Sequence, residues 1–239
     1  MSICSFSQEE KSEKITNKGK FFVYWGWNRA NYSNSDIHFT GNNYDFTLRD
    51  VTAQDRQTPF SFNDYLNPVR ITIPQNNYRI GYFLKENYTI SIGVDHMKYV
   101  MDAGQTVKIN DDIVLSEDFL QLEHTDGLNY VNVEFRRFDD ISHLIGLNHR
   151  NFQINLTEGF GAGILYPRTD VTLLGQERHD EFHLAGWGAS AVVGLNLTFF
   201  KYFFIQSDLK LGYINMPDVR TTISLDDKAT QSFTFFERT

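Results

Sequence analysis

The sequence predicts an all-β fold: an eight-stranded antiparallel up-and-down β-barrel that spans a membrane. Apolar and polar residues alternate in eight segments, as in strands whose two faces meet different surroundings. The connections between these segments are alternately long and short, and glycines and charges of both signs share the polar face. A soluble, lipocalin-like binding barrel with its apolar face turned inward fits the same alternation, so it remains an alternative.

The composition narrows the class of protein. The chain has 239 residues, a net charge of -8 and 15% aromatic residues, which suits one large β domain. It has no run of about 18 apolar residues, so no transmembrane helix is expected. The acidic balance argues against nucleic acid as a partner, because binding it needs clustered Lys and Arg. With Cys4 as the single cysteine, neither a disulfide framework nor a cysteine-based zinc site is expected, and no cofactor is predicted.

The chain divides into three parts. Residues 1–8, MSICSFSQ, have the pattern that ends a signal peptide, with Ser7 before a cleavage position and Gln8 as the mature start. Residues 9–20 are polar, and we expect them to be flexible. Residues 21–239 are expected to form a single β-barrel domain. We expect the chain to be truncated, and the barrel to be open between its first and last strands because the last segment stops at Thr239.

The first three strands are expected at residues 21–28, 77–84 and 88–97, each with one apolar and aromatic face. A long polar connection follows the first strand and contains one probable hairpin sequence, DIHFTGNNYDFTL, with Gly-Asn-Asn as its turn. A tight turn joins the second strand to the third.

The fourth and fifth strands are expected at residues 128–138 and 151–165. The polar connection before the fourth contains two strand-like stretches, TVKIN and DIVL. Glu158 falls on the apolar face of the fifth strand, where a charge facing lipid would be costly. A bulge or a slip in register is therefore expected there.

The clearest hairpin is predicted from residues 182 to 213, with strands at 182–199 and 203–213. One of its faces is apolar and aromatic, and the other carries glycines, hydroxyls and charges. The eighth strand begins at Ser232. Connections after odd-numbered strands are long and those after the second and sixth are very short, which fits periplasmic turns and outer loops if the N-terminus is periplasmic.

The polar faces supply charges for the interior of such a barrel. Side chains fill the lumen of a narrow barrel, and opposite charges there can pair. We therefore expect a plugged lumen, not an open pore. The predicted lumen charge network comprises Arg79, Asp95, Glu134, Arg136, Asp208 and Lys210.

A second cluster is expected at the outer rim of the third and fourth strands: Asp95, His96, Glu123, His124 and Asp126. Two histidines beside carboxylates could bind a divalent metal, with His96 and His124 as the candidate ligands. The simpler interpretation is that these side chains hydrogen-bond to loops, and we favour it. His179 and His183, at the top of the sixth strand, are expected to be solvated.

A general base oriented by an acid is the other chemistry open to this cluster, with His124, Asp126 and Glu134 as the candidate catalytic residues. A phosphate-binding loop, a GxSxG elbow and an HExxH motif are all absent from the sequence, which argues against common soluble enzymes. We therefore do not expect an enzyme.

Several segments carry a resemblance to a known group: GVDHMKYV, EHTDGLNYVNVE, GLNLTFFKYFF and GYINMPDVRTT, together with the CSFSQ sequence near the N-terminus. The chain resembles the small, uncharacterised outer-membrane β-barrel proteins of Bacteroidota-type bacteria. The resemblance implies the fold and the outer membrane of a Gram-negative envelope. It carries no established chemistry. For such a barrel we expect outer-membrane lipid, lipopolysaccharide and envelope proteins as partners.

An eight-stranded barrel is too narrow to be an open porin, so the function that we expect is structural, with surface interactions made by the long outer loops. A lipid-modifying enzyme is the alternative. Outer-membrane lipid A deacylases resemble the chain in strand number and use a His, a Ser and an acid on the outer half of the barrel. Here HTDGLNY has no serine where that motif would place one, so the resemblance fails at the nucleophile.

Overall fold

A computed structural model describes residues 16–67, 69–70, 74–109, 112–114, 120–124, 126–147, 151–173, 175–176 and 178–239. The predicted signal-peptide remnant, residues 1–8, and residues 9–15 of the predicted flexible segment lie outside the described residues. No helix in this part of the chain is both long enough and apolar enough to cross a membrane.

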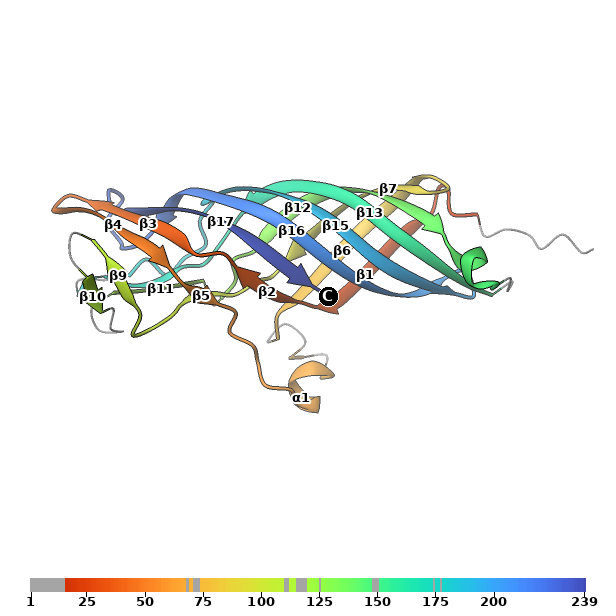
Figure 1. Cartoon of the computed structure of the whole chain (residues 1–239), viewed down its shortest axis with the longest axis horizontal. Helices are drawn as coiled ribbons and strands as arrows, with labels where there is room; N and C mark the ends of the chain where they lie inside the picture. The colour runs from red at the N-terminus through yellow and green to blue at the C-terminus, as the bar shows by residue number, and fades with distance from the viewer. Residues whose placement is uncertain are drawn as a thin grey trace, which may run out of the picture.

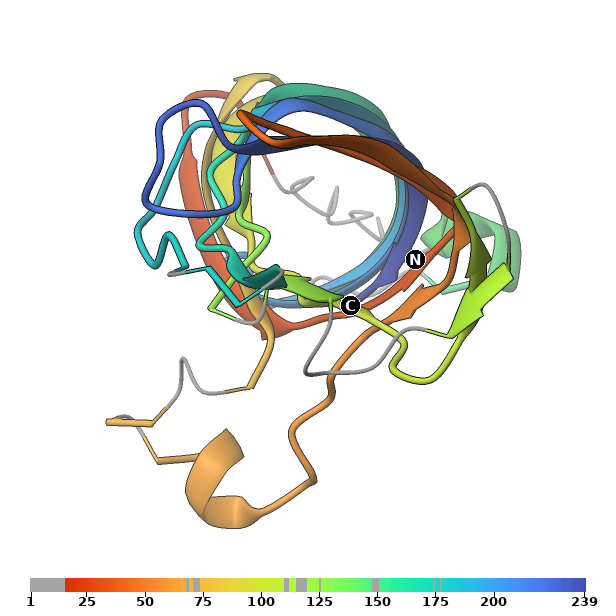
Figure 2. The ribbon, with the colours of Figure 1, turned by 90° about the vertical axis from the view of Figure 1, so that its left-hand side faces the viewer.

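Eight strands of one antiparallel sheet follow one another around a cylinder (Figures 1 and 2). Each overlaps a predicted strand, because the period-2 alternation extends along it, but the seventh continues to Arg220 instead of residue 213 and the eighth begins at Lys228 instead of Ser232. In spatial order they are β1 (Phe21–Trp27), β6 (Asn76–Lys85), β7 (Tyr88–Asp95), β12 (Tyr130–Asp140), β13 (Phe152–Leu165), β15 (Gly186–Phe199), β16 (Phe203–Arg220) and β17 (Lys228–Arg238).

The long connections lie at one end of the cylinder and build a further structure, which we call the head (Figure 1). Five of its strands extend the large sheet to thirteen: β2 (Arg29–Tyr32), β3 (Ser35–Gly41), β4 (Tyr44–Val51), β9 (Thr106–Lys108) and β10 (Asp112–Val114). Four more form a second sheet in the order β14 (Asp170–Leu173), β11 (Leu120–His124), β8 (Tyr99–Met101) and β5 (Ala53–Gln54). Two short helical turns complete the described elements: α1 (Phe62–Tyr65) and η1 (Ser142–Ile145).

The prediction of an eight-stranded barrel was therefore wrong in the number of strands. The hairpin DIHFTGNNYDFTL forms β3 and β4, while TVKIN and DIVL contain β9 and β10. The strands of the smaller sheet were not predicted at all. They are two to five residues long, too short for an alternating pattern to stand out from a polar connection.

The sheet does not close along its full height. β1 pairs with β6 from Phe21 to Trp27, and the chain then passes through Asn28 into β2, which pairs with β17. Between Thr239 and the end of the cylinder with the short turns, no described strand lies between β1 and β16. Here β1 faces the first residues of β16 across a cleft of about 420 Å³. An open seam was predicted between the first and last strands, and no ladder joins β1 to β16 or β17 within the described residues.

The outer face of the cylinder is apolar. Large apolar side chains stand exposed on all eight strands, and we call them the belt. Its members are Phe21, Val23, Trp27, Tyr78, Ile80, Leu84, Ile90, Ile92, Val133, Phe160, Ile164, Trp187, Val193, Leu195, Phe203, Ile205, Leu209, Leu211, Tyr213 and Phe236. The inward positions of the same strands are polar and buried, among them Arg79, Asn132, Glu134, Thr157 and Lys210. This distribution is the reverse of that in a soluble barrel.

In the head the distribution of apolar and polar side chains is reversed. Ile214 and Met216 on β16 and Phe233 on β17 point inward and are buried with side chains of the smaller sheet, such as Leu122 and Val171, in one apolar core. The outer face of the head carries charged pairs such as Asp36 with Arg49. One strand therefore serves two environments: moving along β17 from the head, its inward side chains change from Phe233 to Glu237.

Glu158 faces outward on β13, and the strand has neither a bulge nor a register shift there. Both alternatives expected from the sequence were therefore wrong. It lies opposite Arg137 of β12, which in turn lies opposite Tyr88 of β7. Tyr88 is close to the short turn after β6, whereas on its other side Glu158 lies opposite Val193, a residue of the belt.

Glycines on the inward face make room for the interior side chains. A Cβ on Gly161 would lie 2.7 Å from Cγ of Glu134 and 3.0 Å from the carbonyl oxygen of Val133. Ala162, the next residue, faces outward and is exposed.

We predict that Gly161→Val lowers the free energy of unfolding by about 1–3 kcal/mol, the usual cost of overpacking. The measurement is urea unfolding of the protein folded in lipid vesicles, followed by tryptophan fluorescence. Ala162→Val is the matched control and should be close to neutral. Equal effects of the two variants would contradict the crowded interior.

Candidate functional site

Seven charged side chains form one buried network inside the cylinder, and we call it the lumen network. They come from five strands, β6, β7, β12, β16 and β17. Its members are Arg79, Asp95, Glu134, Arg136, Asp208, Lys210 and Glu237.

Glu134 is the centre of this network, because it faces three cations. Its Oε1 lies 2.9 Å from Nη2 of Arg79 and 3.0 Å from Nζ of Lys210. Its Oε2 accepts a hydrogen bond from Nε of Arg136 at 2.7 Å. The Glu134 side chain is fully buried, so these contacts replace its water shell.

The other carboxylates surround the same cations. Asp95 pairs with Lys210, and Asp208 accepts from Nη1 of Arg136 at 2.8 Å. Glu237 lies 3.5 Å from Nζ of Lys210 and accepts from Asn28 at 2.6 Å. Three cations thus face four carboxylates in a space from which water is largely excluded, which makes the network a plug, not a channel lining.

Apolar and aromatic groups border the plug on both sides. Towards the short turns, Phe22 contacts the rings of Tyr24, Phe83 and Phe204, and Phe83 contacts Phe138. Towards the head, Tyr130 packs against Phe235 above the charges. The low polarity of these borders strengthens the ion pairs between them.

All six residues predicted for the lumen lie in the network, but Glu237 was missed. Glu237 has the same parity as the buried Phe233 and Phe235 on β17. The sequence pattern would have placed this apolar face outward, so only the tertiary structure puts Glu237 in the lumen.

The five residues of the predicted rim cluster do not converge on one point. Asp95 points into the lumen network, and His96 bonds through Nδ1 to Oδ1 of Asn129 at 2.8 Å. Glu123 pairs with Arg56 at 2.9 Å on the exposed face of β11. Asp126 pairs with Arg168 at 3.0 Å.

His124 points the other way from Glu123, into the core of the head, because neighbouring residues on a strand face opposite sides. It is fully buried against the ring of Tyr99, and its Nδ1 lies 2.9 Å from Oγ1 of Thr169. Burial lowers the pKa of His124 to about 3. Its candidate catalytic partners, Asp126 and Glu134, pair with arginines elsewhere, so neither of these two acids orients His124.

The remaining histidine candidates are also accounted for. Nε2 of His183 lies 3.0 Å from Oδ2 of Asp218, and the ring of His179 lies 6.4 Å from that of His183. Within the described residues, no three His, Cys, Asp or Glu side chains group closely enough to hold a metal ion.

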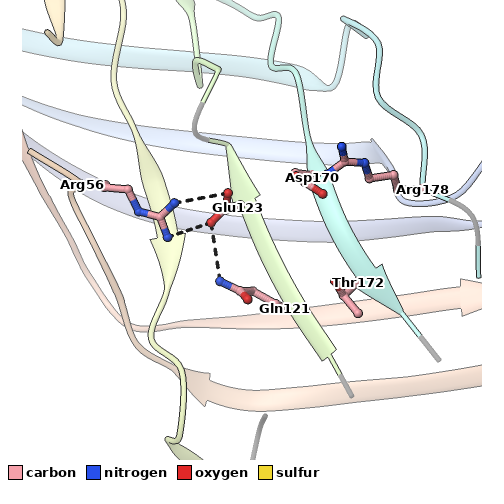
Figure 3. A pocket seen from close by; sticks show the side chains of 6 residues that line it. All are labelled: Arg56, Gln121, Glu123, Asp170, Thr172 and Arg178. Atoms are coloured by element: carbon pink, nitrogen blue, oxygen red, sulfur yellow. Dashed lines mark hydrogen bonds and ion pairs between the residues drawn. The ribbon is translucent and has the colours of Figure 1, made fainter. Parts of the chain in front are cut away.

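A polar hollow of about 290 Å³ lies on the exposed face of the smaller sheet (Figure 3). Arg56 reaches Glu123 with both terminal guanidinium nitrogens, Nη2 at 2.9 Å and Nη1 at 3.4 Å, and Arg178 pairs with Asp170. Gln121 and Thr172 complete its lining. Guanidinium and carboxylate groups presented together suit polar ligands, since they offer directed donors and acceptors. The sequence gives no clear signal of this site, because β11 and β14 are too short for their alternation to stand out.

No family model matches the sequence, and no curated protein matches it either. Two solved structures resemble the chain at 9% sequence identity. The outer membrane protein OprG from Pseudomonas aeruginosa does so with a TM-score of 0.46, over 93% of this chain and 94% of that one. Ail, the attachment invasion locus protein of Yersinia pestis, does so with a TM-score of 0.31, over 93% and 99%. Similarity this distant says nothing about function, so the function has to be inferred from the geometry of the chain itself.

We predict that Lys210→Met lowers the free energy of unfolding by about 3–5 kcal/mol, because Asp95, Glu134 and Glu237 lose a shared cation. Urea unfolding in vesicles measures this. Arg137→Met removes an exposed pair with Asp139 and should cost under about 1 kcal/mol. The double variant Lys210→Met/Asp95→Asn should recover part of the loss. A loss no larger than that of Arg137→Met would refute the role of Lys210.

We also predict that His124 makes stability depend on pH. Its folded pKa is below the unfolded value of about 6.5, so the unfolded state binds the extra proton as the pH falls, and stability declines from pH 6.5 towards pH 3. Between pH 7 and 5 the loss should be about 2 kcal/mol larger in the wild type than in His124→Gln. Unfolding at pH 8, where His124 is neutral in both states, isolates the packing effect of the substitution. Parallel pH profiles would rule out a buried neutral imidazole.

Proposed function

We propose that the chain is an outer-membrane β-barrel protein of a Gram-negative envelope, with a plugged lumen and a head that makes surface interactions. The observation that carries this proposal is the belt. Large apolar side chains are exposed on all eight strands of the cylinder while the inward face holds buried charges. In water such a surface would be costly, whereas in a bilayer it is the surface that lipid requires.

The two other classes of function fit the chain less well. A lipocalin-like barrel needs an apolar interior for its ligand, but the interior of this cylinder is occupied by the lumen network. A lipid-modifying enzyme needs an accessible base, but His124 is fully buried. The plug also argues against an open porin.

The head provides the surface for interaction. It has an apolar core, shared with β16 and β17, and charged pairs on its exterior. The hollow with Arg56 and Arg178 is a polar site on the smaller sheet. We assign contact with lipid to the belt, and contact with lipopolysaccharide or envelope proteins to the head. A Bacteroidota-type origin stays a prediction from the sequence.

We predict that Leu211→Arg destabilises the protein in vesicles by about 2–4 kcal/mol, because the charge would face the hydrocarbon. Asn43→Arg, at the exposed tip of the β3–β4 hairpin, is the control and should be near neutral. Urea unfolding in vesicles measures both. The wild type should also fractionate with outer membranes and show heat-modifiable mobility in gels. A tolerated Leu211→Arg, with the wild type in the soluble fraction, would sink the proposal.

A further inference from the structure

One segment of the head carries apolar side chains that no part of the described chain covers. We call residues 57–67 and 69–70 the arm. Phe60, Phe62, Leu66 and Val69 are 60–90% exposed there. The arm contains α1 and projects sideways from the cylinder in both views (Figures 1 and 2).

The arm is held in place by Tyr65. Its ring packs 5.7 Å from that of Trp27, at the outer end of β1. Its hydroxyl accepts a hydrogen bond from Arg29 at 2.6 Å and donates one to the carbonyl oxygen of Thr58 at 2.8 Å. These contacts fix the base of the arm at the height of Trp27, where the belt gives way to the head.

The charged side chains of the arm, Asp64 and Arg70, pair with each other. Ser61 caps α1 by accepting from the backbone N–H of Asp64 at 3.0 Å, and it donates to the carboxylate of Asp64 at 2.7 Å. Arg70 lies 3.2 Å from the same carboxylate. The arm therefore presents apolar side chains with little unpaired charge, a combination that suits a membrane interface.

We propose that the arm lies in the outer interface of the bilayer and inserts Phe60, Phe62, Leu66 and Val69 among the lipids. The inference rests on the proposed function, since it needs the belt to be in lipid. The occupant of this apolar surface is a lipid surface because the arm continues the belt at Trp27. Tryptophan and tyrosine side chains favour this depth, where an apolar ring and a polar edge are both accommodated.

Position separates the arm from other exposed apolar groups of the head. Ile223 and Leu225 are 63% and 79% exposed in the loop between β16 and β17. That loop lies at the far end of the head, away from the belt (Figure 1). Exposure alone therefore does not assign a lipid contact, and Leu225 supplies a matched control.

The test places one fluorescent label at a time in the full chain. Cys4 is replaced by Ser, and Phe62→Cys, Leu66→Cys, Leu225→Cys and Leu211→Cys are each labelled with an environment-sensitive dye. Each protein is folded into phosphatidylcholine vesicles with or without brominated acyl chains. Heat-modifiable mobility verifies the fold of each variant.

We expect labels at positions 62 and 66 to emit at shorter wavelength than the label at 225, and to be quenched by brominated lipid at least about twofold more strongly. The label at 211 reports the belt. Quenching at 211 but none at 62 and 66 overturns the arm inference alone. No quenching at 211 overturns the proposed membrane location itself.

Discussion

The burial of Glu134 against Arg79, Arg136 and Lys210 is the interaction on which the cylinder depends. A buried carboxylate is tolerated only when cations and hydrogen bonds replace its hydration. These partners come from three different strands, so the network ties together strands that are not neighbours in the sheet. The network also requires space inside the cylinder, which inward glycines such as Gly161 leave free for its side chains.

The same strands satisfy opposite demands at their two ends. Inside the cylinder the charges pair with each other and the apolar residues face outward. In the head the apolar residues turn inward, because water is the solvent outside. β17 shows the transition within one strand, from Phe233 in the core to Glu237 in the plug. This change in the inward side chains along β17 marks the edge of the belt, and the arm lies at that edge.

The seam between β1 and β16 leaves a boundary of the sheet without strand pairing. Unpaired backbone groups are costly in hydrocarbon, so this cleft is the least protected part of the wall. Trp25 and Trp27 line it, and Tyr65 of the arm packs on Trp27 at its outer end. The partner change at Asn28 lets β2 complete the wall beside β17 above the cleft.

The period-2 alternation by itself determined the eight strands of the cylinder, because each is long enough for the pattern to stand out. It also indicated which charges share the interior, since the parity of a strand assigns its faces without reference to any other strand. Only the tertiary structure decided the rest. Pairing partners, the inclusion of Glu237 and the burial of His124 depend on which strands meet, and adjacent positions such as Glu123 and His124 face opposite sides once β11 joins a sheet. The short strands of the head and the arm held by Tyr65 arise from contacts between residues far apart in the chain, which a local pattern does not encode.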